Sequence, residues 1–470
     1  MPKTFENITN IVLEAADKAR KEIDADKISS YVSAPVEWPV ECTVGPGLEG
    51  AIACETKIGY VSGKQGNLVY RGYNIFDLCA HSTYEEVAYL LLHGNLPNAE
   101  RLSEFKSKLA EFRYLPKTLR LLMGFPLEDM NAMAALRMGT NLMRQHQTER
   151  DLMQAKVDRT KVISSDDDSV DTHEKVRGEQ RAVYEFRDPK ANRPARRKAK
   201  RDLQQAKGVE SCYHLIAGVS TLTAAIARIQ RGSLPIEPDP ELGHAANLLY
   251  MMTGKRPTRE AERVMDIALI LHADHGMNAS TFAAMVVAST LSDIYFSIGS
   301  GIAALNGPLH GGANEEVLKT LREIADPKRV DGWYASARKN RRKIMGFGHR
   351  VYKAYDPRAR VLAPLADYLV NKSGDAEAKN LLKIASGLET RVVADLGASK
   401  GIFPNVDFYS GLMYSSMGIP SEMFTPIFAV SRVAGWTARV LEYMKSNRIF
   451  RPRATYVGEI SRGFTPLADR

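Results

Sequence analysis

Apolar residues recur along most of the chain at the three- and four-residue spacing of amphipathic helices. Ser82 with Glu85 three positions on is typical of a capping box, in which each side chain satisfies a free backbone N–H at a helix start. The helix behind it is expected to end at Gly94, and its apolar face consists of Val87, Ala88, Leu90 and Leu91. The pattern predicts a mainly α protein.

Two further helices follow the same logic. One is expected to start at Asn314, because Glu315 and Glu316 suit the positive end of a helix. Its apolar positions are Val317, Leu318, Leu321 and Ile324. The other is expected from about Pro426 to Met444, with a stop near Asn447.

Two segments depart from the amphipathic pattern. Residues 57–70 alternate around a glycine-containing turn and predict one small β-hairpin near the N-terminus. Residues 278–305 carry a single charge, Asp293, and are long enough to cross a bilayer. Their Ser, Thr, Gly and Ala content, between polar segments that bear histidines, favours a buried helix hairpin instead.

Charge and composition separate one stretch from the rest. Residues 149–208 are strongly polar and poor in large apolar side chains, which predicts a solvated or partly helical insertion. Residues 187–201 alone contribute +7 to the net charge of +9. The four cysteines show no C-x-x-C spacing, which fits a reducing compartment, and residues 1–26 lack the pattern of a signal or transit peptide. We therefore expect a cytoplasmic protein.

His310 lies between glycines, in residues 306–314, just before a predicted helix. Glycines let the backbone approach a ligand closely, and a helix start offers free N–H groups to an oxygen that gains charge. His310 either hydrogen-bonds a carbonyl that becomes an enolate or merely caps the loop. The residues alone leave both interpretations open.

His349 follows a glycine pair in residues 345–358, a stretch dense in hydrogen-bond donors. The basic residues in and before it are Arg341, Arg342, Lys343, Arg350, Lys353 and Arg358. Such a set suits an anionic ligand with phosphates and carboxylates, although a solvated basic loop is the simpler alternative.

Asp407 lies between Val406 and Phe408, where loss of hydration would make its carboxylate a stronger base. The alternative is that Asp407 is the N-cap of the next helix.

Arg432 lies in an otherwise apolar helix and should meet an acid or a bound carboxylate. A structural ion pair is the alternative to a substrate-binding role. His272 and His275 are expected to share a helix face, but no third ligand is near in sequence, and we predict no metal site.

Taken together, these motifs resemble the citrate synthase family, in the order that the family shows them. The resemblance covers about residues 46–148 and 211–465. Its N-terminal part rests on residues 47–50, 56–58, 71–75 and 82–91, and its C-terminal part on the clusters around His275, His310, His349 and Asp407. Relatives commonly have His where this chain has Arg439.

The resemblance implies a two-domain, mainly helical fold. Residues 1–45 would form an N-terminal helical arm. A large domain would comprise residues 46–311 and 426–470 and carry the insertion at about 149–208. A small domain, residues 312–425, would close over the active site and exclude water.

The resemblance also implies the chemistry, a condensation of acetyl-CoA with oxaloacetate in the tricarboxylic acid cycle. Asp407 would remove a proton from the acyl-CoA carbon, His310 would hydrogen-bond the thioester oxygen, and His349 would polarise the ketone. The carboxylates would be held by His275, Arg358, Arg432 and Arg451. Arg451 would reach the neighbouring subunit's site in a homodimer. We assign coenzyme A binding to Arg342, Lys343, Gly346 and Gly348, and expect no metal or other cofactor.

Two alternatives remain at this stage. A 2-methylcitrate synthase using propionyl-CoA would need the same catalytic residues, because one methylene changes only pocket packing, by about 1–3 kcal/mol. A nucleic-acid-binding protein acting through residues 187–201 is the alternative from another class. That stretch lacks aromatic residues interleaved for base stacking, which makes it the weaker one.

Overall fold

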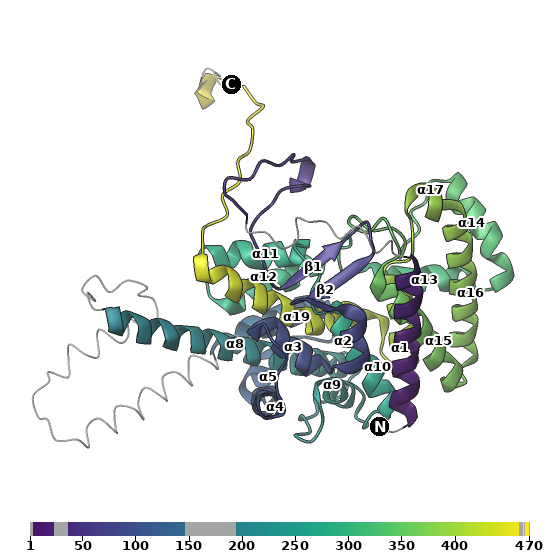
Figure 1. The fold of residues 1–470 in the computed structure, drawn as a ribbon, viewed down its shortest axis with the longest axis horizontal. Coiled ribbons are helices and arrows are strands. Elements are labelled where there is room, and N and C mark those ends of the chain that lie inside the picture. Colours follow the sequence, from purple (N-terminus) through teal and green to yellow (C-terminus); the bar gives the residue numbers. More distant parts are fainter. Residues whose placement is uncertain (1–2, 23–35, 146–193, 460–463, 465, 470) are drawn as a thin grey trace, which may run out of the picture.

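Helices make up most of the chain in the computed structural model, which describes residues 3–22, 36–145, 194–459, 464 and 466–469 (Figure 1). Those before residue 146 include α1 (Lys3–Glu22), α2 (Ile75–His81), α3 (Tyr84–His93), α4 (Ala99–Arg113) and α5 (Pro116–Leu122). From there to Leu305 lie α8 (Pro194–Ile229), α9 (His244–Thr253), α10 (Arg259–His272), α11 (Ala279–Ser289) and α12 (Ile294–Leu305). The last are α13 (Ala313–Ile324), α14 (Val330–Lys339), α15 (Pro357–Ser373), α16 (Ala376–Val392), α17 (Ala398–Lys400), α18 (Val406–Ser416) and α19 (Phe424–Tyr443). The mainly α prediction is confirmed.

The predicted hairpin is present as β1 (Gly59–Ser62) and β2 (Asn67–Tyr70), which pair antiparallel. A short third strand, β3 (Tyr73–Asn74), extends the sheet in the order β1-β2-β3. The hairpin tip supports the segment that follows His349, because the N–H of Lys353 donates to the carbonyl of Gly63 at 2.9 Å.

The predicted capping box is displaced by one residue. Thr83, not Ser82, caps α3, and its partner is Glu86 rather than Glu85. The reason is that α2 continues to His81, so Ser82 is needed as the cap that ends α2. The predicted end of α3 at Gly94 is confirmed, with that glycine in the left-handed region at φ 94°.

Two other helix starts also differ slightly from the prediction. Helix α13 begins at Ala313, so Asn314 lies buried in the first turn rather than at the N-cap. Its side-chain oxygen accepts from the N–H of Glu315 at 2.9 Å. Helix α19 begins at Phe424, two residues before the expected Pro426.

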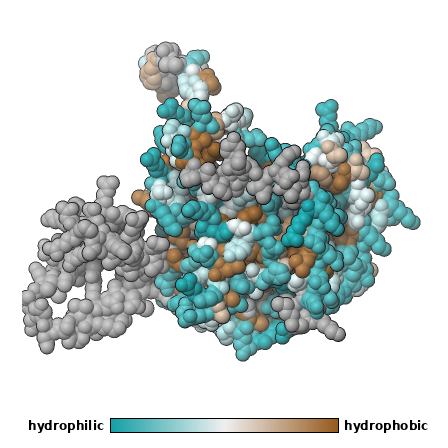
Figure 2. Space-filling model, in the orientation of Figure 1, coloured by the Kyte–Doolittle hydropathy of each residue, from teal (hydrophilic) through white to brown (hydrophobic). Residues whose placement is uncertain are grey.

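Residues 278–305 form the predicted helix hairpin, α11 packed against α12, and not one continuous span. The segment Gly208–Ile229 of α8 has the length and apolar character of a membrane span, but 83% of its most apolar stretch is buried inside the protein. On the face drawn in Figure 2, hydrophilic residues predominate and hydrophobic ones form separate areas. A core helix of a folded domain explains these features.

The polar insertion predicted at about 149–208 lies largely outside the described residues. Its last part, from Pro194, belongs to α8, whose N-terminal half projects from the body of the molecule (Figure 1). The basic stretch 187–201 therefore ends within this helix.

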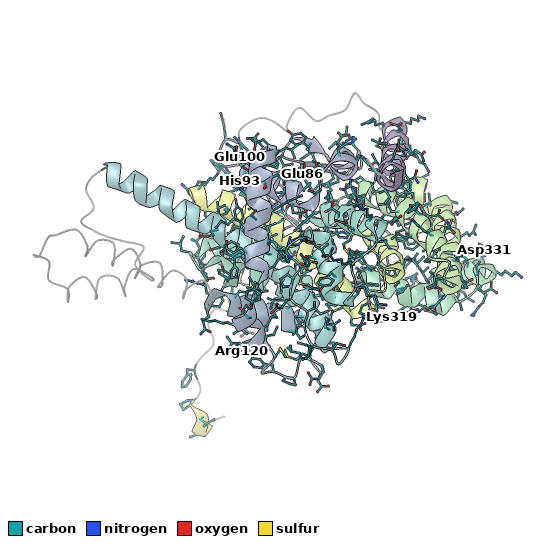
Figure 3. The ribbon with its side chains drawn as sticks, turned by 90° about the horizontal axis from the view of Figure 1, so that it is seen from below. Glu86, His93, Glu100, Arg120, Lys319 and Asp331 are labelled. Atoms are coloured by element: carbon teal, nitrogen blue, oxygen red, sulfur yellow. The ribbon has the colours of Figure 1, made fainter. Side chains whose placement is uncertain are left out.

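Helices α13 to α18 lie together at one end of the molecule, where α18 packs against α13, α15 and α16. Asp331 of α14 lies at the opposite end from His93 of α3 (Figure 3). Residues 36–45 are not helical. Helix α1 itself lies between the two ends and packs against α2, α10 and α15. Helix α1 thus joins two groups of helices that are far apart in sequence.

The close approach of α10 and α19 positions the segment that carries His275. The Oγ of Ser431 donates to the carbonyl of Leu269. A Cβ on Gly435 would lie 2.2 Å from the carbonyl oxygen of Ala273, so no side chain is tolerated there without movement. Behind this contact, Arg439 binds Asp274 in a buried bidentate pair, with distances of 2.6 and 2.7 Å.

We expect Gly435→Ala to lower the free energy of unfolding by about 1–3 kcal/mol, because its methyl group would push on the backbone at Ala273. Gly332→Ala in α14 is the matched control, since an added Cβ there would lie in open space. There, helix propensity favours Ala by up to about 1 kcal/mol. Denaturant unfolding of both variants measures the difference, and equal changes would contradict the packing argument.

Candidate active site

His310 lies between α12 and α13, and its ring is held by the start of α11. The backbone N–H of Ser280 donates to Nε2 at 3.2 Å, and the Ser280 hydroxyl lies 2.8 Å from the same nitrogen. A backbone N–H cannot accept, so the contact from the Ser280 N–H assigns Nε2 as the acceptor and leaves the proton on Nδ1. Burial, with a smaller effect of Arg432, lowers the pKa of His310 to about 4. At neutral pH it is an uncharged donor.

His349 is held in the opposite tautomer by the turn that follows it. The backbone N–H groups of Val351 and Tyr352 donate to Nδ1 at 2.9 and 3.2 Å, which places the proton on Nε2. Burial, and then the charge of Arg358, lower its pKa to about 4. His349 is therefore also a neutral donor, through its other nitrogen.

Asp407 lies in the first turn of α18, and the cap of that helix is Asn405, whose side-chain oxygen accepts from the N–H of Asp407 at 3.1 Å. The N-cap interpretation of Asp407 is therefore wrong. Its Oδ1 is buried with no hydrogen-bond partner among the described residues. Burial raises the pKa of this carboxyl to about 7, against the opposing effect of Arg358. Such a carboxylate is a base poised near neutrality.

The glycines before His349 shape this region. Gly346 and Gly348 both have positive φ, 81° and 78°. A Cβ on Gly346 would lie 2.7 Å from the ring of Phe408, next to Asp407. The N–H of Asn405 donates to the carbonyl of Gly346 at 2.9 Å, and the Asn405 amide donates to that of Gly348 at 3.0 Å. The loop before His349 is thus tied to the start of α18.

His272 and His275 do not share a helix face, contrary to the sequence-based expectation. Helix α10 ends at His272, whose Nδ1 lies 2.7 Å from the carbonyl of Ala268, and His275 follows in the loop. His275 turns instead toward His349, with ring centroids 5.1 Å apart. Burial, and then Arg358, lower its pKa well below the usual value. Across the described part of the chain, no group of three or more His, Cys, Asp or Glu side chains is arranged to hold a metal ion.

Arg358 and Arg432 are both buried but differ in charge compensation. Arg358 forms a two-point pair with Asp356, with distances of 3.0 and 2.7 Å. Arg432 donates from Nε to the carbonyl of His272 at 2.5 Å, and its guanidinium lies 4.7 Å from the ring of Phe428. No described carboxylate is within salt-bridge distance of Arg432, and burial lowers its pKa to about 10. The alternative of a structural ion pair is thus not found among the described residues, and a bound carboxylate is the natural partner of Arg432.

The remaining predicted residues lie elsewhere or are already engaged. Arg342 makes a two-point pair with Glu323, with both distances 2.6 Å, and lies over the ring of Trp333. Lys343 is exposed. Arg451 is exposed just after Phe450, which stacks on Tyr443, and Arg451 has no ion pair or side-chain hydrogen bond within the portion of its own chain that the structure describes.

Sequence reasoning missed three residues that hold the site together: Ser280, Tyr352 and Asp356. Ser280 donates to His310. Tyr352 contacts both His349 and His275, and Asp356 pairs with Arg358. A partial signal existed for Asp356, because an Asp before Pro at a helix start is a common cap. The other two depend on contacts 30 and 77 residues away along the chain, which no local pattern encodes.

Comparison with known proteins agrees with the geometry. The chain matches the family model described as citrate synthase, C-terminal domain, over residues 47–453. It is 39% identical over 427 residues to a citrate synthase of Deinococcus radiodurans, covering 91% of this chain and 99% of that protein. It is 32% identical over 429 residues to a 2-methylcitrate synthase of Shewanella oneidensis, covering 91% of this chain and 98% of that protein.

Two solved structures share the fold over nearly their whole length. A citrate synthase from Pyrobaculum aerophilum aligns with a TM-score of 0.75 at 38% identity, covering 93% of this chain and 100% of that chain. A citrate synthase from Thermoplasma acidophilum, solved as a ternary complex with carboxymethyl coenzyme A and oxaloacetate, aligns with a TM-score of 0.74 at 31% identity. It covers 92% of this chain and 100% of that chain.

The raised pKa of Asp407 predicts a stability cost that depends on pH. Because the carboxyl keeps its proton to about pH 7 when folded but loses it near 4 when unfolded, stability falls as pH rises between those values. Asp407→Asn should therefore raise Tm relative to the parent protein more at pH 8 than at pH 5. Asp331→Asn, at a carboxylate that is 86% exposed, is the control. A Tm difference for Asp407→Asn that is the same at both pH values would contradict the assignment.

Proposed function

We infer from its sequence and fold that this chain, which belongs to the citrate synthase family, condenses acetyl-CoA with oxaloacetate and water to give citrate and CoA. The observation that carries the mechanism is the pairing of a buried, unpartnered carboxylate at Asp407 with two histidines held neutral in defined tautomers. That set provides one base and two uncharged donors, which is what enolate chemistry at a thioester requires.

The first step forms the nucleophile. Asp407 takes a proton from the methyl carbon of acetyl-CoA, and the thioester oxygen gains charge as the enol or enolate develops. His310 donates a hydrogen bond to that oxygen from Nδ1, because Nε2 is occupied by Ser280. The carboxylate is strong enough as a base because it has been taken out of water.

The second step joins the two substrates. His349 donates from Nε2 to the ketone oxygen of oxaloacetate and protonates the alkoxide as the enolate carbon attacks. Arg432 supplies an uncompensated positive charge to a substrate carboxylate, while Arg358 keeps its pair with Asp356 and offers its remaining donor. His275 is the third residue that would contact the substrate carboxylates. Water then hydrolyses the citryl-CoA thioester, which makes the overall reaction effectively irreversible.

The same residues would serve propionyl-CoA, the substrate of a 2-methylcitrate synthase. The relative of that name is more distant than the citrate synthase of Deinococcus radiodurans, at 32% against 39% identity. This difference supports acetyl-CoA as the preferred substrate. Neither reaction, as proposed, uses a residue of the basic stretch 187–201.

We further propose the domain division 46–311 with 426–470 and 312–425, with residues 1–45 as an N-terminal arm. The grouping of α13 to α18 at one end of the molecule supports it. Coenzyme A would lie along Gly346 and Gly348, with Lys343 and Arg342 near its phosphates, and Arg342 would then leave Glu323. All four cysteines are unpaired, which supports a cytoplasmic location.

The exposed position of Arg451 supports a homodimer in which this side chain completes the neighbouring subunit's site. The segment before it is tied to α11 of its own chain, where Asn447 and Phe450 bond to Ser289. Beyond Arg451 the chain leaves the body with exposed apolar side chains, among them Tyr456 and Val457. A second copy would cover these residues and place the guanidinium against a substrate carboxylate.

We expect His310→Ala to reduce condensation by about 10²–10⁴-fold while the fold is kept, because the developing oxyanion loses its donor. Release of CoA from acetyl-CoA, measured in parallel with propionyl-CoA, tests both the mechanism and the substrate. His81→Ala, at an exposed residue ending α2, is the control. Near-parental turnover in His310→Ala would refute the assignment, and a higher kcat/KM for propionyl-CoA would favour 2-methylcitrate synthesis.

Mixing two inactive variants tests the shared site. Arg451→Ala and Asp407→Ala chains should each be nearly inactive, but a mixed dimer would have one site with both defects and one with neither. Refolding the two together should therefore restore part of the parental activity. Mixed dimers that form, as shown by differently tagged chains, yet stay inactive would mean that Arg451 acts within its own chain.

A further inference from the structure

Tyr352 has so far been given a role only through its backbone N–H, but its side chain also lies within the site. Its side chain is 1% exposed. Its ring centroid is 5.4 Å from that of His275 and 4.9 Å from that of His349. The guanidinium of Arg358 lies over its ring at 6.0 Å. One aromatic side chain thus contacts three of the groups proposed to handle oxaloacetate.

The hydroxyl of Tyr352 has one recorded hydrogen-bond partner within the described residues, Nε2 of His275 at 3.2 Å. Burial raises the pKa of this phenol well above its usual value, so it remains protonated. A buried O–H needs an acceptor, and Nε2 of His275 is the acceptor at hand. The phenol therefore donates, Nε2 accepts, and the proton of the neutral imidazole is on Nδ1.

The contact also joins two parts of the chain that are 77 residues apart. His275 follows α10, which packs on α19, whereas Tyr352 belongs to the turn between His349 and α15. The backbone N–H of Tyr352 already holds Nδ1 of His349. The same residue can therefore set the tautomers of both histidines, one through its main chain and the other through its side chain.

We propose that Tyr352 is a positioning residue for oxaloacetate, holding His275 in the tautomer and orientation that present Nδ1–H to a substrate carboxylate. This inference rests on the proposed function of the site. Without the hydroxyl, His275 can rotate or exchange its proton between nitrogens, and part of the population would turn a lone pair toward an anion. Oxaloacetate binding weakens, whereas proton abstraction by Asp407 does not depend on this contact.

Tyr352→Phe tests the proposal, because it removes one oxygen and keeps the ring over Arg358. KM for oxaloacetate should rise by about 3–10-fold, the usual effect of one neutral hydrogen bond, while kcat and KM for acetyl-CoA change by less than about twofold. Tyr295→Phe is the matched control, since this buried tyrosine lies 2.8 Å from Nδ1 of His214 outside the site. It should lower Tm similarly and leave both KM values unchanged.

A double-mutant cycle then separates positioning from direct contact. The dissociation constant of oxaloacetate is measured by calorimetry for the full chain, for Tyr352→Phe, for His275→Gln and for the double variant. If Tyr352 acts through His275, adding the second substitution to the first raises the dissociation constant of oxaloacetate by less than about twofold.

Three results would overturn the proposal while leaving the function intact. They are an unchanged affinity in Tyr352→Phe, fully additive losses in the double variant, and equal losses of kcat and of oxaloacetate affinity. A parental protein that neither binds oxaloacetate nor releases CoA from acetyl-CoA would instead refute the proposed function itself.

Discussion

Arg432 is buried in the apolar helix α19, and no described carboxylate lies within salt-bridge distance of its guanidinium. This uncompensated charge is one of the electrostatic influences on the rest of the site. Burial lowers the pKa of His310 and of His275, and Arg432 adds to this effect, at His275 after Arg358. Arg358 and then Arg432 limit the rise of the pKa of Asp407 that burial causes. Burying such a charge costs stability unless an anion pairs with it, so the site is electrostatically suited to a carboxylate.

Neutral histidines are useful only if their protons are on the correct nitrogen, and the backbone decides this. An N–H at the start of α11 holds Nε2 of His310, while two N–H groups after His349 hold its Nδ1. His310 therefore donates to its ligand from Nδ1, whereas His349 donates from Nε2. Because main-chain groups do not change protonation, these assignments hold wherever the rings are neutral, above their lowered pKa of about 4.

Much of the fold followed from local sequence. Three features could be predicted from the hydrophobic period, the position of a glycine or the length of a segment. They are the hairpin at 57–70, the end of α3 at Gly94 and the helix hairpin within 278–305. Two of the errors came where two nearby residues were both suitable as a helix cap. Ser82 and Thr83 each have a Glu three positions on, and only the end of α2 decides between them. Likewise, Asn405 takes the cap that Asp407 was equally able to fill.

The sequence by itself determined the chemical groups and their order, because motifs around His275, His310, His349 and Asp407 carry both the residue types and the glycines that expose them. Tertiary structure decided the protonation states and the partners. The lone pair of His310 is met by Ser280, 30 residues away, and His275 meets Tyr352, 77 residues away. The physical reason is that burial and charge, which set a pKa or a tautomer, are properties of the neighbours in space and not of the neighbours along the chain.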